Sequence, residues 1–249
     1  MRKITAKTPF WEVKAASEKV GEVFIYGDIV SEKWFESDVT AKGFQEDLEA
    51  LGDIDTLNVY INSYGGSVFQ AQAIYTILKR HPASVNVYID GLAASAASLV
   101  AVAGDTVYIP ENAMMMVHWP WSLAIGNASD LRREADALDK IGESMVAAYL
   151  AKTGDALTGE TLAELLDAET WMTAQEAVEY GFADELVEAK EIAASGDPEW
   201  LKRYKNVPEN VLEMAQKGDK PQEDSDLRAK IAAECEEMTS RVKQILGGI

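Results

Sequence analysis

The stretch DGLAASAASLVAVAG, residues 90–104, decides how the rest of the chain is interpreted. An alternating apolar run at residues 85–89 leads into it, and a run of small residues that carries Ser95 and Ser98 follows. The pattern predicts a strand, a tight turn at the Asp-Gly pair, and then a helix. N–H groups in the first turn of a helix lack helical partners, so a serine there lies beside donors that can stabilise an oxyanion. The stretch is a candidate site for a serine nucleophile, although helices of this kind are also common in tightly packed cores.

The same strand-turn-helix pattern precedes this stretch. Strands are expected at residues 22–29, 57–62, 85–89 and 106–109, and helices at residues 37–51 and 68–80. The segments NVYIN, residues 58–62, and NVYID, residues 86–90, are near copies 28 residues apart. A repeat of this kind indicates stacked strand-turn-helix units. Strands that alternate with helices predict an α/β architecture with mainly parallel pairing.

A glycine turn, SYGGS at residues 63–67, follows one of these strands. Ligands of parallel sheets collect where strands end and helices begin, so a backbone N–H at Gly65 or Gly66 is expected beside Ser95. A phosphate cradle is the competing function, but the turn lacks the P-loop lysine. A turn needed only for its backbone angles is the structural alternative.

The chain has two histidines, which limits the search for a general base. His81 lies in a polar connection at a helix end, where a surface cap is the expected role. His118 lies in the apolar run MMMVHWPW, one strand beyond Ser95 and at the same sheet edge if the strands are parallel. A hydrogen-bonded core histidine is the alternative, but this position makes His118 a candidate general base.

Composition excludes several classes of protein. The 249 residues include 47% hydrophobic residues, enough for a buried core, and the net charge of −19 argues against nucleic acid or an anionic membrane as the main partner. One cysteine excludes an intrachain disulfide, and two histidines with one cysteine make a metal site or other bound cofactor unexpected. We see no signal peptide and no apolar run long enough to span a membrane, and expect a cytoplasmic protein.

Four motifs occur in an order that resembles a known family. They are INSYGGSV at residues 61–68, GLAASAAS at 91–98, MMMVHWPW at 114–121 and ETWMTAQEAVEYGFADEL at 169–186. Together they resemble the ClpP-type serine peptidases, in particular the ClpP-related head maturation proteases of tailed bacteriophages and prophages. The resemblance covers roughly residues 22–188. It implies a ClpP/crotonase-type spiral of strand-strand-helix units with a projecting helical arm, and assembly into rings.

The resemblance also assigns the site residues. It implies Ser95 as nucleophile, His118 as general base, Glu169 as the third triad member, and the backbone N–H groups of Gly66 and Ala96 as the oxyanion hole.

The chain departs from the family pattern at three positions. The archetype has aspartate where this chain has Glu169, which is one methylene longer, so Asp167 remains an alternative third member. Tyr64 stands where ClpP often has proline. Ala96 replaces a larger residue, but a backbone donor does not depend on its side chain.

We expect three regions along the chain. Residues 1–188 form the protease domain. The resemblance implies that the helix expected at about residues 128–152 is the arm, with a helix packed on its own core as the alternative. Residues 189–226 read as a polar linker with a short helix near 211–216, and residues 227–249 as an amphipathic helix with near-heptad spacing. Our hypothesis is that this extension docks the protease to a self-associating or capsid-assembly partner, with a helix folded back on the body as the alternative.

The predicted function is a serine endopeptidase that acts through an acyl-enzyme as a ring-like homo-oligomer, cleaving capsid or scaffold proteins during phage head maturation. One alternative is a general degradative ClpP-like subunit that works with an ATP-dependent unfoldase, since the chain has no nucleotide-binding motif of its own. The others are an acyl-CoA enzyme, as in the crotonase relatives, and a non-catalytic assembly protein. The Ser95 and His118 pair argues against the acyl-CoA class.

Overall fold

The computed structural model describes residues 13–29, 41–189, 201, 204–209 and 211–212. Its strands are β1 (Val13–Ser17), β2 (Val20–Tyr26), β3 (Thr56–Ser63), β4 (Ser84–Ala94), β5 (Thr106–Pro110), β6 (Met114–Val117), β7 (Thr170–Thr173) and β8 (Glu185–Val187). Its helices are α1 (Ala41–Ala50), α2 (Val68–Lys79), α3 (Ala96–Ala101), α4 (Ala128–Thr153), the 3-10 turn η1 (Gly154–Ala156), α5 (Gly159–Asp167) and α6 (Ala174–Glu179).

The strands of the described residues form one sheet in the order β1-β2-β3-β4-β5-β8. All neighbours from β2 to β8 run parallel, while β1 runs antiparallel to β2. Strand β6 pairs in parallel with the second half of β4 and antiparallel with β7. The predicted α/β architecture with mainly parallel pairing is therefore confirmed.

The internal sequence repeat corresponds to two neighbouring strands in register. Asn58 of β3 pairs with Asn86 of β4, and Tyr60 pairs with Tyr88. The two asparagine side chains are hydrogen-bonded at 3.2 Å, and the two tyrosine rings stack with centroids 5.1 Å apart. Alternate residues such as Val59 point to the other face and are fully buried. Each copy of the repeat thus contributes one polar and aromatic face and one core face to the sheet.

The predicted turn at Asp90 and Gly91 is wrong. Strand β4 continues through both residues to Ala94, and helix α3 begins only at Ala96. The pairing partner changes along the strand, since β4 lies beside β5 in its first half and beside β6 from Leu92 onward. The hydrogen bonds to β6 outweigh the turn preference of an Asp-Gly pair, and small side chains allow the strand to bend between partners.

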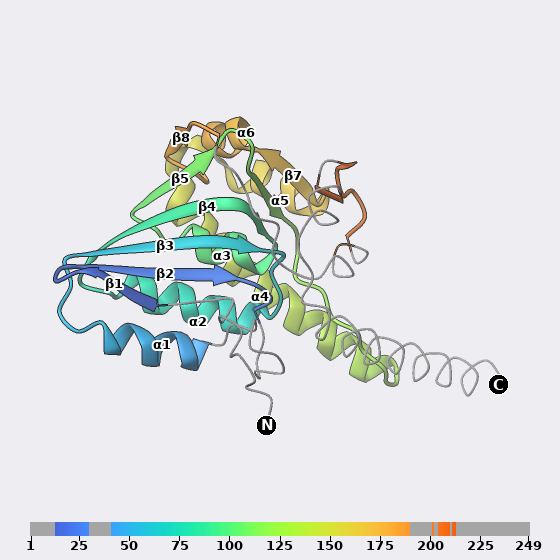
Figure 1. Cartoon of the computed structure of the whole chain (residues 1–249). Helices are drawn as coiled ribbons and strands as arrows, with labels where there is room; N and C mark the ends of the chain where they lie inside the picture. The colour runs from blue at the N-terminus through green and yellow to red at the C-terminus, as the bar shows by residue number, and fades with distance from the viewer. Residues whose placement is uncertain (1–12, 30–40, 190–200, 202–203, 210, 213–249) are drawn as a thin grey trace, which may run out of the picture.

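Helix α4 is the projecting arm that the sequence predicts. Helices α1 and α2 lie along one face of the sheet, while α4 extends away from it (Figure 1). Asn127 begins α4 with a capping box that includes Asp130. The buried residues of α4 lie in its second half, where Met145 and Tyr149 pack on the core. The first half of the helix presents mostly exposed side chains.

Several sequence-based predictions fall partly outside the described residues. The C-terminal helix at 227–249 lies wholly outside them, as does most of the segment at 189–226. Helix α1 covers the later part of the helix expected at 37–51. The three-region division stays a prediction. In the described part of the chain, no helix has the length and apolar character needed to cross a membrane.

Candidate active site

Ser95 lies at the junction between β4 and α3, in a strained backbone conformation. Its φ is 52° and its ψ −124°, which is unusual for a residue with a side chain. Its N–H donates to the carbonyl of Met116 in β6 at 2.9 Å, which fixes the junction against the neighbouring strand. Strain of this kind persists only where the surrounding structure imposes it, and it is concentrated at functional sites.

The strain predicts a difference between two substitutions. Ser95→Gly is expected to have a free energy of unfolding about 1 kcal/mol higher than that of Ser95→Ala. Glycine adopts this backbone conformation without strain, and the relief outweighs the extra conformational entropy that glycine gives the unfolded chain. Both variants lack the hydroxyl, so the comparison isolates the backbone. Urea denaturation followed by tryptophan fluorescence measures it. Equal stabilities, or a more stable alanine variant, would contradict the strain.

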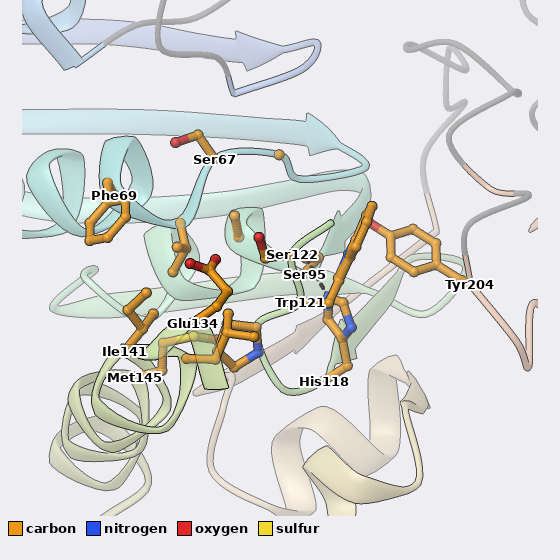
Figure 2. Close-up of a pocket in the computed structure, with 15 residues that line it drawn as sticks. Ser67, Phe69, Ser95, His118, Trp121, Ser122, Glu134, Ile141, Met145 and Tyr204 are labelled. Atoms are coloured by element: carbon orange, nitrogen blue, oxygen red, sulfur yellow. Dashed lines mark hydrogen bonds between the residues drawn. The ribbon is translucent and has the colours of Figure 1, made fainter. Parts of the chain in front are cut away.

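The structure brings Ser95 and His118 together, as the parallel-edge argument predicts. His118 directly follows β6, and its Nε2 lies 2.6 Å from Ser95 Oγ (Figure 2). This separation is short enough for proton transfer from the hydroxyl to the imidazole. The imidazole is buried, with 8% of the residue's surface exposed. The pair thus has the geometry of a nucleophile and its general base.

Burial lowers the pKa of His118 below its ordinary value of 6.5, while the charge of the Glu169 carboxylate raises it. The net shift is downward. At neutral pH the imidazole is therefore mainly unprotonated and able to accept the proton of Ser95.

This pKa shift predicts the pH dependence of the reaction. A protonated His118 cannot act as a base, so kcat/KM for peptide hydrolysis should rise with pH through a limb whose midpoint lies below 6.5. Activity should then stay level to about pH 8. Initial rates at low substrate concentration across this range measure the profile. A midpoint above 6.5 would contradict the buried general base.

The glycine turn lies directly against the nucleophile. A Cβ built on Gly65 would lie 2.9 Å from Ala96 N, so only glycine allows this approach. Ile29 N–H donates to Gly65 O, and Ser67 N–H donates to Ile29 O. Ile29 is thus bridged to Gly66 through the residues on either side of it, and the Gly66 N–H takes no part in these two hydrogen bonds.

The second predicted donor is the N–H of Ala96. Ala96 is the first residue of α3, where the N–H has no carbonyl partner within the helix. Ala96 adjoins Ser95, and its N lies close to Gly65 of the glycine turn. The role of the pair as an oxyanion hole stays a prediction.

Neither candidate for the third triad member is hydrogen-bonded to His118 in the described structure. Asp167 accepts a hydrogen bond from Trp119 Nε1 at 2.6 Å. Glu169 Oε1 instead accepts from the backbone N–H groups of Lys205 and Asn206, the latter at 3.1 Å. Of the two carboxylates, Glu169 is the one whose charge raises the pKa of His118. The triad assignment of Glu169 stays a prediction.

A cleft of about 310 Å³ opens beside Ser95 and His118. Helix α4 contributes Leu138, Ile141 and Met145 to its apolar lining, and Glu134 adds a carboxylate from the same helix. Figure 2 shows Glu134, Ile141 and Met145 of this helix facing the Ser67 and Phe69 side of the cleft. The cleft is large enough for a peptide side chain next to the reacting carbonyl.

Sequence reasoning missed Tyr204, which also lines the cleft. Its ring lies edge-on to His118 with centroids 5.4 Å apart. A signal was present, since the apolar residues Leu201, Tyr204, Val207 and Val211 recur at intervals of three and four within an otherwise polar segment. The pattern is too short for periodicity alone to predict where it packs.

The second histidine, His81, lies apart from this cleft. His81 Nδ1 accepts from the N–H of Ala83 at 3.2 Å just beyond α2, whose C-cap is Arg80, so this bond does not cap the helix and the capping role of His81 stays a prediction. Within the described ranges, no three His, Cys, Asp or Glu side chains are grouped as metal ligands.

Known proteins match this chain both in sequence and in structure. A family model described as Clp protease matches residues 19–190. Among solved structures, a point mutant of ClpP1 from Listeria monocytogenes is similar to this chain, with 25% sequence identity and a TM-score of 0.58. The match covers 68% of this chain and 92% of that chain. The expected ClpP-type fold is confirmed, while the relationship to phage head maturation proteases stays a prediction.

Proposed function

The chain belongs to the Clp protease family, and on that premise we propose that it is a serine endopeptidase with Ser95 as nucleophile. The observation that carries the proposal is the 2.6 Å separation of Ser95 Oγ and His118 Nε2 at the mouth of a cleft. The strained φ of Ser95 supports it, because backbone strain of this kind is concentrated at functional sites.

The mechanism follows from these positions. His118 Nε2 accepts the proton of Ser95 as Oγ attacks the peptide carbonyl carbon, and the N–H groups of Gly66 and Ala96 stabilise the oxyanion. His118 then donates the proton to the leaving amine, which breaks the C–N bond and leaves an acyl-enzyme. Water, deprotonated by the same imidazole, releases the acyl group and restores Ser95. Glu169 stabilises the imidazolium through its charge.

Hydrolysis of a denatured protein tests the proposal. Incubation with unfolded casein, followed by mass spectrometry of the products, should show new peptides with free amino and carboxyl ends. Intact casein together with intact capsid and scaffold proteins, in every oligomer fraction, would contradict the proposal. Retention on a CoA affinity resin would favour the acyl-CoA alternative.

We further propose that the enzyme works as a homo-oligomer in phage head maturation. Four large apolar side chains are exposed near the start of the arm, on Trp121, Leu123, Ile125 and Leu131. Exposed apolar groups gathered in this way are typical of protein interfaces and support self-association. The four sequence motifs support the head-maturation role.

Two measurements separate these claims. Light scattering should give a mass several times 27.2 kDa, whereas a monomer would contradict self-association. Incubation with the capsid and scaffold proteins of the encoding virus should yield defined cleavage products from wild type and none from Ser95→Ala. Rapid degradation only in the presence of an ATP-dependent unfoldase would instead favour the general degradative role.

A further inference from the structure

A short C-terminal segment packs on the domain beside the active site. Among its described residues, Leu201, Tyr204 and Val211 are buried against a small cluster that includes Leu92 and Met116. The segment lies beyond the last residue matched by the family model. The contact is therefore an addition of this chain to the family domain, and it reaches the catalytic groups.

The backbone of this segment holds the Glu169 carboxylate. The N–H groups of Lys205 and Asn206 both donate to Oε1, and the Asn206 side chain donates to Ala168 O at 2.9 Å. Two donors on one oxygen restrict a side chain that otherwise has three rotatable bonds. The restriction matters more for glutamate than for aspartate, because the extra methylene adds one of those bonds.

Tyr204 contacts the other parts of the site. Its ring lies edge-on to His118, and its hydroxyl donates to Tyr64 O at 2.7 Å. Tyr64 directly precedes the glycine turn that carries the predicted oxyanion donor Gly66. One side chain therefore packs on the general base and is anchored to the turn.

The backbone of Glu169 gives an independent indication. Among the described residues, two that are not glycine have a positive φ, namely Ser95 at 52° and Glu169 at 51°. Glu169 follows the end of α5, where glycine is the usual residue in this conformation. A glutamate held there against its backbone preference indicates a functional constraint on its side chain.

We propose that Tyr204, Lys205 and Asn206 are positioning residues of the active site, which orient the Glu169 carboxylate and the His118 ring for catalysis. The proposal rests on the serine peptidase mechanism above. It means that a segment beyond the family domain contributes to the orientation of the Glu169 carboxylate.

Proline substitution tests the backbone donors in the full-length chain. Lys205→Pro removes one N–H, while Lys205→Ala keeps it and serves as the matched control. Removing groups that orient a functional residue typically lowers activity roughly 10- to 100-fold, so we expect this loss of kcat, with little change in KM, for the proline variant alone. In a Glu169→Ala background, Lys205→Pro should cause no further loss.

Equal activities of the proline and alanine variants, or additive losses with Glu169→Ala, would overturn the proposal. A faster proline variant would also overturn it, because the segment would then restrain Glu169 rather than position it.

Imidazole NMR gives a readout that does not depend on peptidase activity. The chain has two histidines, so His81 provides an internal reference for the titration of His118. The charge of Glu169 raises the pKa of His118, so losing its orientation in Lys205→Pro should lower that pKa. Glu169→Gln removes the charge while the segment stays packed, and it should lower the pKa of His118 similarly. Simple unpacking of the segment would instead raise the pKa of His118, because its burial is what lowers it. An unchanged or raised pKa in the proline variant would overturn the proposal, even if no hydrolysis were detected in wild type.

Discussion

Ser95→Ala is expected to lower kcat for peptide hydrolysis by at least about 10⁴-fold without unfolding the protein. The hydroxyl is the only group lost, and its described side-chain contact is the hydrogen bond to His118. Removing a nucleophile leaves only the contributions of substrate binding and the oxyanion donors. Turnover of a fluorogenic peptide or casein, alongside circular dichroism, measures both parts of the expectation.

Ser98→Ala is the matched control for this substitution. Ser98 lies one helical turn away, where its hydroxyl donates to Ser95 O at 2.6 Å and contacts the buried Tyr149 hydroxyl at 2.9 Å. Its loss should lower the free energy of unfolding by about 1 kcal/mol while most of the activity remains. If the two alanine variants lost activity equally, Ser95 would not be the nucleophile.

Gly66→Ala is expected to lower kcat by roughly 10²- to 10³-fold, as when an oxyanion donor is lost. A Cβ at this position would lie 2.2 Å from the Ile29 carbonyl oxygen, so the turn must shift away. The φ of 139° also disfavours any side chain. The shift moves the Gly66 N–H away from the position that the oxyanion would occupy.

Gly52→Ala is the control that distinguishes the steric clash of a Cβ at Gly66 from the strain of placing alanine at a positive φ. Gly52 also has a positive φ, of 70°, but a Cβ there would have no atom within 4 Å. This variant should lose about 1 kcal/mol of stability and keep its kcat. Full activity in Gly66→Ala, measured with the same substrate, would exclude Gly66 as an oxyanion donor.

Sequence reasoning predicted the meeting of Ser95 and His118 because both follow strands whose ends share one edge of a parallel sheet. It predicted stacked strand-turn-helix units because the sequences of β3 and β4 are near copies, and the structure pairs these copies residue for residue. Both predictions depend on local patterns that repeat along the chain. They did not require knowledge of how distant segments pack.

The features that sequence reasoning missed depend on long-range contacts. The continuation of β4 past Gly91 is stabilised by pairing with β6, which local turn preference cannot reveal. The contact between the Tyr204 hydroxyl and Tyr64 joins residues 140 positions apart. The hydrogen bonds of Glu169 to the C-terminal segment likewise join residues 36 and 37 positions apart. The C-terminal segment has few apolar residues, and its sequence alone does not indicate which surface of the domain they pack against.

The most direct test of the central claim is intact-mass spectrometry after treatment with a fluorophosphonate, which reacts with activated serines. We expect one adduct per wild-type chain, mapped to Ser95, retained in Ser98→Ala and absent from both Ser95→Ala and His118→Ala. Labelling should be repeated on each isolated oligomer fraction, since activation can depend on assembly. An adduct that survives in Ser95→Ala, or no adduct in any wild-type fraction, would contradict the assignment of Ser95 as a nucleophile activated by His118.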